Sequence, residues 1–202
     1  MAVVLVTGCS SGFGEAIAEA FVRRGDTVVA SMRQPDHAPA SLRAAANRSG
    51  ARLEILQLDV TDAGSRARSI DAIMRLFGRL DVLVNNAGVA CSGSLEDTSL
   101  ELLRLVFETN FFGPHEMMRL ALPIMREQGA GRIINVTAIG AIFSTPLYDA
   151  YCSSKHAMDS ISAAAEAPAA IRVRHRPLSA GAARTVFLRL PPSPSSRPAK
   201  PA

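Results

Sequence analysis

The start of the chain joins a short apolar run to a glycine-rich turn. Val3 to Val6 is a continuous aliphatic stretch, typical of a strand buried on both faces, and TGCSSGFG, residues 7–14, follows it directly. An amphipathic helical pattern comes next, whose predicted apolar face holds Phe13, Ile17, Ala20 and Phe21. Glycine lets the backbone of such a turn approach a phosphate, and a helix N-terminus presents free N–H groups to it. The stretch predicts a pyrophosphate-binding turn, with a plain tight turn as the alternative.

Strand and helix patterns then alternate along most of the chain. Further β-branched or aliphatic runs predict strands at 27–32, 53–58, 82–84 and 132–136. Helical patterns are predicted over 61–77, with Thr61 as its N-cap, over 97–127 and over 151–165. The predicted core positions of these helices are Ile70, Ile73, Met74, Phe77, Leu100, Leu103, Phe107, Met118 and Ile124. Such alternation predicts an α/β fold with a parallel sheet, whose ligands bind beyond the carboxyl ends of the strands.

Two polar clusters follow predicted strands at that edge. Asp59 ends the third strand, where its carboxylate can accept a hydrogen bond from an adenine amino group; a capping or loop acid is the alternative. Asn85-Asn86-Ala87-Gly88 ends the fourth strand, where small residues let a flat ligand lie against the backbone. An ordinary turn also explains this second cluster.

Tyr151 and Lys155 are spaced for proton chemistry. Residues four apart share one face of a helix, so the phenol and the ammonium are predicted to point the same way. We expect the ammonium to lower the tyrosine pKa, as a general acid or base working near neutral pH requires. A pair on the surface of a helix is the alternative reading of this spacing.

Composition narrows the function classes. A chain of 202 residues is long enough for one domain, and no apolar run reaches the ~20 residues that span a bilayer, so a cytoplasmic protein without membrane contact is expected. Three widely spaced cysteines predict free thiols and no metal site. Residues 1–162 carry 15 basic and 17 acidic side chains, while residues 163–202 carry seven basic side chains and one acidic side chain. The basic balance belongs to the tail, which argues against a nucleic-acid partner.

Taken together, these motifs resemble the short-chain dehydrogenase/reductase family. The matching residues are T7-G8-x-x-x-G12-x-G14, D59-V60, N85-N86-A87-G88, Asn110 and Y151-x-x-x-K155, within residues 3–162. The resemblance implies a Rossmann-like, doubly wound sheet and hydride transfer between NAD(P) and a small alcohol or carbonyl compound. It further implies catalytic roles for Tyr151, Lys155 and Asn110, and a possible homodimer. The implied dinucleotide contacts are Thr7, Gly8, Ser10, Ser11, Gly12, Phe13, Gly14, Asp59, Val60, Asn86, Ala87, Gly88, Tyr151 and Lys155.

The choice of dinucleotide follows from the end of the second strand. NAD binding usually needs an acid there, but Ala30-Ser31-Met32-Arg33 contains none. Arg33 can pair with a 2′-phosphate, and Ser11 can add a hydroxyl. NADP(H) is therefore expected, with NAD as the alternative. VTGCSSGFG and ASMR are most similar to the hydroxysteroid- and retinol-dehydrogenase-like branch.

The chain departs from the family pattern in two places. Ala138 stands where the family has a serine that polarises the substrate carbonyl. Thr137 replaces it only if the strand has already turned, and Ser144 is a remoter candidate. A catalytically impaired dinucleotide-binding protein is thus the alternative function.

The second departure is the end of the chain. We expect a dinucleotide-binding domain over 1–165 and a divergent Ala-, Pro- and Arg-rich tail over 166–202, disordered from about residue 190. The C-terminal strands of the sheet are therefore expected to be incomplete, although Ile171 to Arg174 can form a sixth strand. The change in composition favours a truncated or frameshifted reading frame over a native tail.

Overall fold

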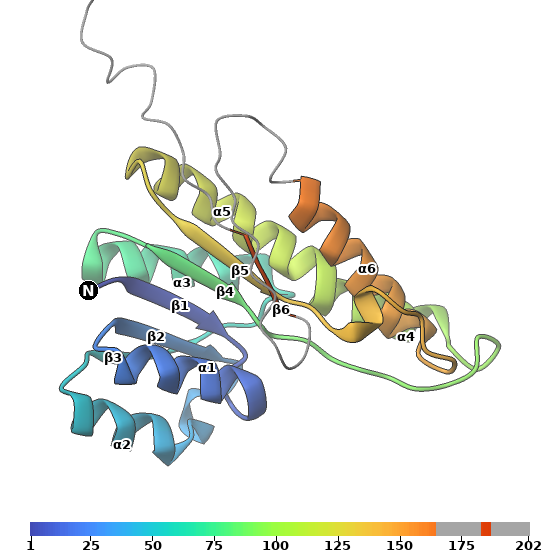
Figure 1. Ribbon diagram of the computed structural model, residues 1–202, viewed down its shortest axis with the longest axis horizontal. Coiled ribbons are helices and arrows are strands. Elements are labelled where there is room, and N and C mark those ends of the chain that lie inside the picture. The colour runs from blue at the N-terminus through green and yellow to red at the C-terminus, as the bar shows by residue number, and fades with distance from the viewer. Residues whose placement is uncertain (165–182, 187–202) are drawn as a thin grey trace, which may run out of the picture.

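The fold is a doubly wound α/β sheet, as the sequence predicted. The computed structural model describes residues 1–164 and 183–186, and its sheet has the strand order β3-β2-β1-β4-β5-β6 (Figure 1). Five strands run parallel: β1 Val3–Thr7, β2 Thr27–Met32, β3 Leu53–Gln57, β4 Val82–Asn85 and β5 Arg132–Val136. Winding reverses between β1 and β4, and in such sheets the crevice at this reversal binds ligands.

Helices cover both faces of the sheet. The helices are α1 Gly12–Arg23, α2 Ala40–Ser49, α3 Ala63–Phe77, α4 Leu100–Phe107, α5 Gly113–Glu127 and α6 Asp149–Ala164. A π-helical turn, η2 Glu108–Phe112, joins α4 to α5, and short 3-10 turns occupy η1 Pro35–His37 and η3 Ile139–Ala141. Figure 1 shows α1 and α2 on one face of the sheet and α3, α5 and α6 on the other.

Alternate residues of the strands enter two separate cores. Val4 and Val6 of β1 pack in the core beneath α1 and α2, whereas Val3 and Leu5 pack in the core with Ile73 of α3. Side chains of a strand alternate between the two faces of a sheet, so one aliphatic run fills both cores. This arrangement explains why the strands read as continuous apolar runs rather than alternating ones.

Several local predictions were wrong. The buried residues of α1 are Gly14, Ala18 and Val22, and Phe13 is 73% exposed, because small residues bring the helix close to the sheet. Asp62, not Thr61, caps α3, accepting a hydrogen bond from the Ser65 N–H at 2.5 Å. Leu100, predicted in the core, is exposed at the start of α4. The helix α2 and the short strand β6 were not predicted.

The β6 strand, Ala183–Val186, pairs with β5 in the antiparallel direction. It covers four residues of an edge that the incomplete C-terminus was expected to leave open. The predicted strand at 171–174, the domain boundary at 165 and the predicted disorder from residue 190 all lie outside the described residues. We therefore keep them as predictions.

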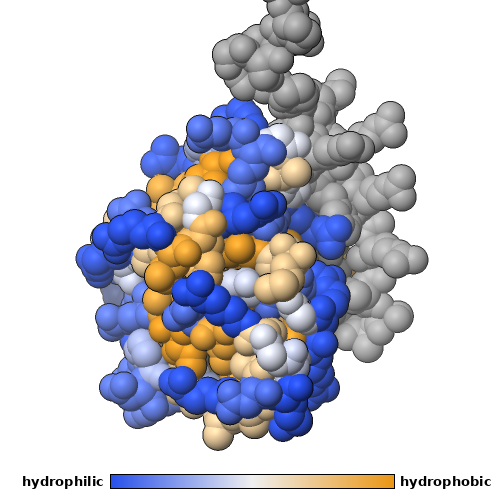
Figure 2. Space-filling view, turned by 90° about the vertical axis from the view of Figure 1, so that its left-hand side faces the viewer, coloured by the Kyte–Doolittle hydropathy of each residue, from blue (hydrophilic) through white to orange (hydrophobic). Residues whose placement is uncertain are grey.

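The two ends of the sheet differ. Figure 2 views the end where the strands begin, and shows apolar side chains in the middle of that face with polar ones around them. Arginines lie over aromatic rings, Arg24 over Phe21 at 4.9 Å and Arg52 over Phe77 at 4.6 Å. The glycine turn and the polar clusters lie at the opposite end of the sheet, where the strands end.

No helix in the described part of the chain is long and apolar enough to cross a membrane.

Candidate functional site

The turn between β1 and α1 requires its glycines. Gly8 and Gly12 have φ of +73° and +63°, in the left-handed region that side chains disfavour. A Cβ on Gly8 would lie 2.8 Å from the Ala87 Cα, and one on Gly14 would overlap the Gly8 carbonyl oxygen. The side chain of Ser11, the N-cap of α1, makes no capping hydrogen bond, which leaves the first N–H groups of the helix for a ligand. The turn thus presents an open backbone surface, a glycine cradle, because Gly8 and Gly14 carry no side chains.

A cavity of about 510 Å³ opens in front of this turn. Its lining comes from the carboxyl ends of the first four strands and from α4 and η2: Gly8, Ser10, Ser11, Phe13, Gly14, Met32, Arg33, Leu58, Asp59, Val60, Thr61, Asn86, Ala87, Gly88, Val89, Leu105 and Thr109. Eleven of the expected dinucleotide contacts are among these residues. Thr7, Gly12, Tyr151 and Lys155 are not.

Residues missed from the sequence complete the wall. Met32, Leu58 and Val89 directly adjoin the predicted residues Arg33, Asp59 and Gly88 in the sequence, and Thr109 directly precedes Asn110. Leu105 lies in a segment predicted as helix. Adjacency to a predicted site residue was therefore the sequence signal for four of these five residues, and Leu105 had none.

Thr7 and Asn86 fasten the ends of β1 and β4 together. The Thr7 hydroxyl donates to the Val84 carbonyl at 3.3 Å and accepts from the N–H groups of Asn86 and Ala87, both at 3.0 Å. Nδ2 of Asn86 donates to the carbonyls of Thr7 at 2.9 Å and Gly8 at 3.2 Å. Thr7 is 1% exposed and lies behind the cavity, where it holds the glycine turn against the β4 loop.

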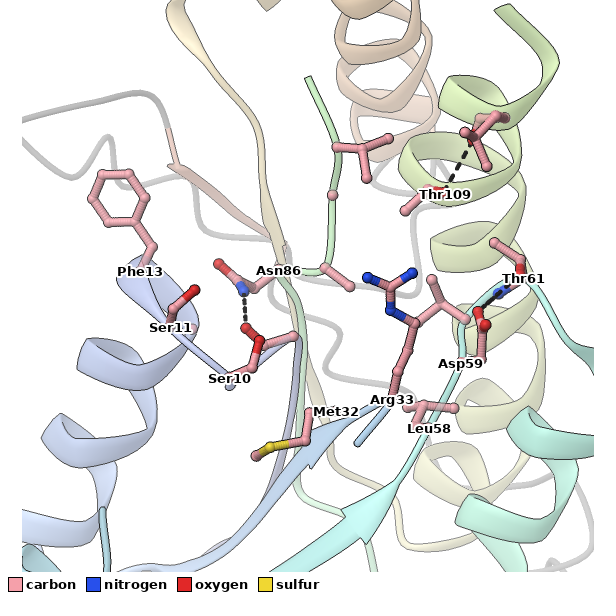
Figure 3. A pocket seen from close by; sticks show the side chains of 17 residues that line it. Ser10, Ser11, Phe13, Met32, Arg33, Leu58, Asp59, Thr61, Asn86 and Thr109 are labelled. Atoms are coloured by element: carbon pink, nitrogen blue, oxygen red, sulfur yellow. Dashed lines mark hydrogen bonds between the residues drawn. The ribbon is translucent and has the colours of Figure 1, made fainter. Parts of the chain in front are cut away.

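Two charged residues face the cavity from β2 and β3. Figure 3 shows the Arg33 guanidinium rising between Asn86 on one side and Asp59 on the other. Oδ1 of Asp59 accepts hydrogen bonds from the Thr61 N–H at 2.9 Å and hydroxyl at 2.8 Å, which orients the carboxylate at the rim. The site thus offers one cation and one oriented anion, which follow the neighbouring strands β2 and β3.

Tyr151 and Lys155 lie on α6 beside the end of β5. The ammonium of Lys155 lies 5.8 Å from the centroid of the Tyr151 ring and donates to the Val136 carbonyl at 3.0 Å. Burial lowers the pKa of Lys155 to about 8. Burial also raises the pKa of Tyr151, with a smaller contribution from Cys152. The expected lowering of the tyrosine pKa by the ammonium is therefore wrong for this structure, because burial of the phenol sets the direction of the shift.

Asn110 links three segments around this pair. It lies in the π-helical turn η2, is 1% exposed, and its Oδ1 accepts from the Val89 N–H at 2.8 Å. Its Nδ2 donates to the Val89 carbonyl at 2.8 Å and to the Ser154 hydroxyl at 3.0 Å. A Cβ placed on Gly88 would lie 3.1 Å from Oδ1 of Asn110 and 3.6 Å from Nζ of Lys155. Gly88 therefore keeps open the space between the cavity and the Lys155 ammonium.

The backbone around Ala138 decides whether Thr137 can stand in for the missing serine. Ala138 is still extended, with φ −149° and ψ 167°, so neighbouring side chains point to opposite faces. Thr137 is buried on the same face as Ile133 and Asn135, whereas Ala138 is on the other. Ser144 is exposed in the loop beyond. The position of the family's serine hydroxyl is thus occupied by a methyl group.

A buried polar chain beneath the site was not predicted. Asn85 of β4 donates to Oδ1 of Asn135 on β5 at 2.8 Å, and Asn135 donates to the Ser162 hydroxyl on α6 at 2.9 Å. Ser162 donates in turn to the Met158 carbonyl at 2.6 Å. This chain fixes α6 against the centre of the sheet, and with it the helix that carries Tyr151 and Lys155.

Comparisons with known proteins identify the family of the chain. The sequence profile described as short chain dehydrogenase matches residues 2–189. A human relative, dehydrogenase/reductase SDR family member 7, is 37% identical over 159 residues, covering 77% of this chain and 47% of the relative. The 3-ketodihydrosphingosine reductase of Bacteroides thetaiotaomicron is 35% identical over 162 residues, covering 80% and 56%. The chain therefore spans about half the length of these two relatives.

A solved structure extends the likeness to the backbone. The alcohol dehydrogenase from the archaeon Thermococcus sibiricus, complexed with 5-hydroxy-NADP, superposes with a TM-score of 0.78 at 28% identity. The match covers 82% of this chain and 70% of that structure.

Proposed function

The chain belongs to the short-chain dehydrogenase family of oxidoreductases, and we propose that it interconverts an alcohol and a ketone or aldehyde with NADP(H). The observation that carries the proposal is the cavity: its glycine turn is shaped to take a pyrophosphate, and Gly88 in its lining lies next to the Lys155 ammonium of α6. A bound nicotinamide dinucleotide supplies or accepts the hydride. The whole reaction transfers one hydride and one proton, so a side chain of the protein must donate or accept the proton.

We assign that proton to the Tyr151 phenol. The phenol is protonated at neutral pH and can donate its proton to a carbonyl oxygen during reduction. Burial raises its pKa and so makes it a weaker acid, which a nearby positive charge must offset as the proton leaves. The Lys155 ammonium is buried next to the Tyr151 ring, where it favours charge on the phenol oxygen as the proton leaves. We propose that Asn110 holds the loop after β4 and the helix α6 in place around Tyr151 and Lys155, and that it takes part in the path by which the proton reaches this pair.

Arg33 supports NADP(H) over NAD(H). It stands at the end of β2 with its guanidinium in the cavity, where a 2′-phosphate can pair with it (Figure 3). We expect Arg33→Ala to weaken NADPH binding about 10- to 100-fold, because a charge-assisted contact contributes roughly 1.5–3 kcal/mol. NADH binding should change little. Fluorescence titration of both cofactors measures this, with Arg48→Ala on α2 as a matched control. Equal losses for NADH and NADPH would show that Arg33 has no part in the choice of cofactor.

The glycine cradle gives a second test. Gly14→Ala should weaken NADPH binding at least about tenfold, because the new methyl overlaps the Gly8 carbonyl and reshapes the turn. Gly78→Ala is the control: Gly78 has φ +66° and open space around its Cβ position, at the far end of α3. It should cost about 1 kcal/mol of stability and leave binding intact. If both variants bind NADPH as the natural chain does, the turn does not hold the dinucleotide.

One observation favours a second candidate, a dinucleotide-binding protein with impaired turnover. Ala138 supplies no hydroxyl, and Thr137 faces the other side of the strand. This candidate predicts normal NADPH binding with little turnover. The homodimer implied by the family resemblance stays a prediction, supported by the exposed Leu100 and Leu102 on α4 and Phe112 on η2.

A further inference from the structure

The buried face of α6 has polar side chains at positions where a helix packed on a sheet normally has apolar ones. Six residues of this helix are buried, and three of them are Ser154, Lys155 and Ser162. Both serines are 0% exposed. A buried hydroxyl costs free energy unless it is hydrogen-bonded, so the partners of these side chains show what holds the helix in place.

Strand β5 holds α6 at two points. The Ser162 hydroxyl accepts a hydrogen bond from Nδ2 of Asn135 at 2.9 Å and donates to the Met158 carbonyl at 2.6 Å. One residue further along β5, the Val136 carbonyl accepts from Nζ of Lys155 at 3.0 Å. Asn135 is 0% exposed, so solvent cannot replace Ser162 as the partner of its amide. Adjacent residues of one strand therefore hold two separate positions of the helix.

The contacts of Lys155 and Ser154 hold only the end of α6 near Tyr151. Ser154 receives its hydrogen bond from Nδ2 of Asn110 at 3.0 Å. Contacts at one end alone leave a helix free to tilt. Ser162 lies seven residues beyond Lys155, about 10 Å along the helix axis, and eleven residues beyond Tyr151, which is about three full turns. Ser162 and Tyr151 therefore lie on nearly the same stripe of the helix, and a hydrogen bond at Ser162 sets the direction in which Tyr151 points.

The polar chain behind Ser162 is costly for the fold. Oδ1 of Asn135 accepts from Nδ2 of Asn85 at 2.8 Å, while Oδ1 of Asn85 is buried without a hydrogen-bond partner among the described residues. Apolar side chains of similar size at these positions would leave no acceptor unpaired. Buried polar side chains that reduce stability can still fix one arrangement of packed elements, because other arrangements leave more groups unpaired. The chain is therefore better suited to specify where α6 lies than to stabilise the fold.

We propose that Ser162 is a positioning residue: through its hydrogen bond with Asn135 it sets the tilt and rotation of α6, and so holds the Tyr151 phenol within reach of the substrate carbonyl. This inference rests on the proposed function, because that function assigns the proton to the phenol. Ser162 acts only through the helix, since it lies about 16 Å along the axis from Tyr151 and does not line the dinucleotide cavity. Loss of its hydroxyl should therefore lower kcat and leave NADPH binding unchanged.

The first arm of the test measures turnover in Ser162→Thr and Ser162→Val. Threonine and valine have nearly the same shape, and only threonine carries a hydroxyl. With saturating NADPH and cyclohexanone, kcat of Ser162→Val should be about 10- to 100-fold below that of Ser162→Thr, because moving a catalytic group by about 1 Å costs up to this much. The Kd of NADPH should be equal in the two variants. Ser160→Ala, at an exposed position of α6, is the control and should match the natural chain.

The second arm measures the placement of Tyr151 without turnover. The chain contains two tyrosines and no tryptophan, so Tyr148→Phe leaves Tyr151 as the sole source of tyrosine fluorescence. In that background, acrylamide should quench Tyr151 more strongly after Ser162→Val than after Ser162→Thr, because the ring of a tilting helix spends more time in contact with solvent. This arm needs neither cofactor nor ketone, so it is independent of the proposed catalysis.

The two arms separate the inference from the proposed function. If the chain reduces cyclohexanone, equal kcat in Ser162→Thr and Ser162→Val would overturn the inference and leave the proposed function standing. If the chain reduces no ketone, the quenching decides: a difference between the variants would uphold the placement of Tyr151 by Ser162 while refuting the proposed catalysis, and equal quenching would refute both.

A merely structural hydroxyl predicts a different result. Ser162→Val would then unfold at a lower urea concentration, with kcat per folded molecule and the quenching of Tyr151 both unchanged, and the positioning role would be rejected. If the added methyl group of threonine and valine prevents folding, Ser162→Ala replaces them and is compared with Ser160→Ala. This pair removes one oxygen each and adds no volume, so the same two measurements decide.

Discussion

Ala138→Ser is expected to raise the turnover of a ketone by roughly 10²–10³-fold, the usual effect of one hydrogen-bond donor aimed at a developing oxyanion. The backbone at Ala138 is extended and its side chain is on the face opposite Thr137. A serine there restores the hydroxyl at the position where the family has it. The measurement is single-turnover oxidation of NADPH at saturating ketone. NADPH affinity should not change, because Ala138 does not line the dinucleotide cavity.

Thr137→Val is the matched control, because it removes the neighbouring hydroxyl that faces the other way. It should leave the rate unchanged both in the natural chain and in Ala138→Ser. A natural chain that turns over rapidly and loses its activity in Thr137→Val would show that Thr137 supplies the donor. An active natural chain that gains nothing from Ala138→Ser would make the serine dispensable here.

Lys155→Met is expected to lower turnover by about 10²–10⁴-fold and to make the protein more stable. The lysine is 5% exposed, and no ion pair of the described residues includes it. A pKa lowered from 10.5 to about 8 corresponds to a burial cost of about 3 kcal/mol at neutral pH. The Val136 carbonyl would lose its hydrogen bond, which offsets about 1–2 kcal/mol. Urea unfolding at pH 7 should show a net gain of about 1–2 kcal/mol.

The pH dependence of stability identifies the cause. Below pH 8 the folded and unfolded chains both hold the Lys155 proton, so the full burial cost is present. Between about pH 8 and 10.5 only the unfolded chain holds it, so this lysine makes stability rise with pH in that window. The rise should disappear in Lys155→Met and persist in Arg75→Met, which removes an exposed cation of α3. A loss of stability in Lys155→Met at pH 7 would mean that the buried ammonium makes stabilising contacts instead.

A buried ammonium of this kind also explains a trade-off at the site. Stability alone would favour an apolar side chain at position 155, yet the proposed proton transfer needs a cation beside the Tyr151 ring. Active sites often retain such costly groups, because function needs a charge that the fold does not. The two effects of Lys155→Met should therefore have opposite signs in activity and in stability.

Local patterns in the sequence determined the parallel sheet and the position of the site within it. The aliphatic runs of β1, β2 and β4 must be buried on both faces, and only helical crossovers connect such strands. The glycines of the β1–α1 turn and the Tyr151–Lys155 spacing are also local, because each depends on residues within about one turn of backbone. Asp59 and Asn86 could be expected to line the same cavity because parallel strands end at a common edge.

Other features depend on which surfaces meet in three dimensions, so only the tertiary structure decided them. Gly14 and Ala18 face the sheet in place of Phe13, since close packing of α1 favours small residues over apolar ones. Asn110 and Val89 are 21 positions apart, and no spacing rule predicts their paired hydrogen bonds. The sign of the Tyr151 pKa shift depends on the balance between burial and charge, and the spacing indicates only the charge.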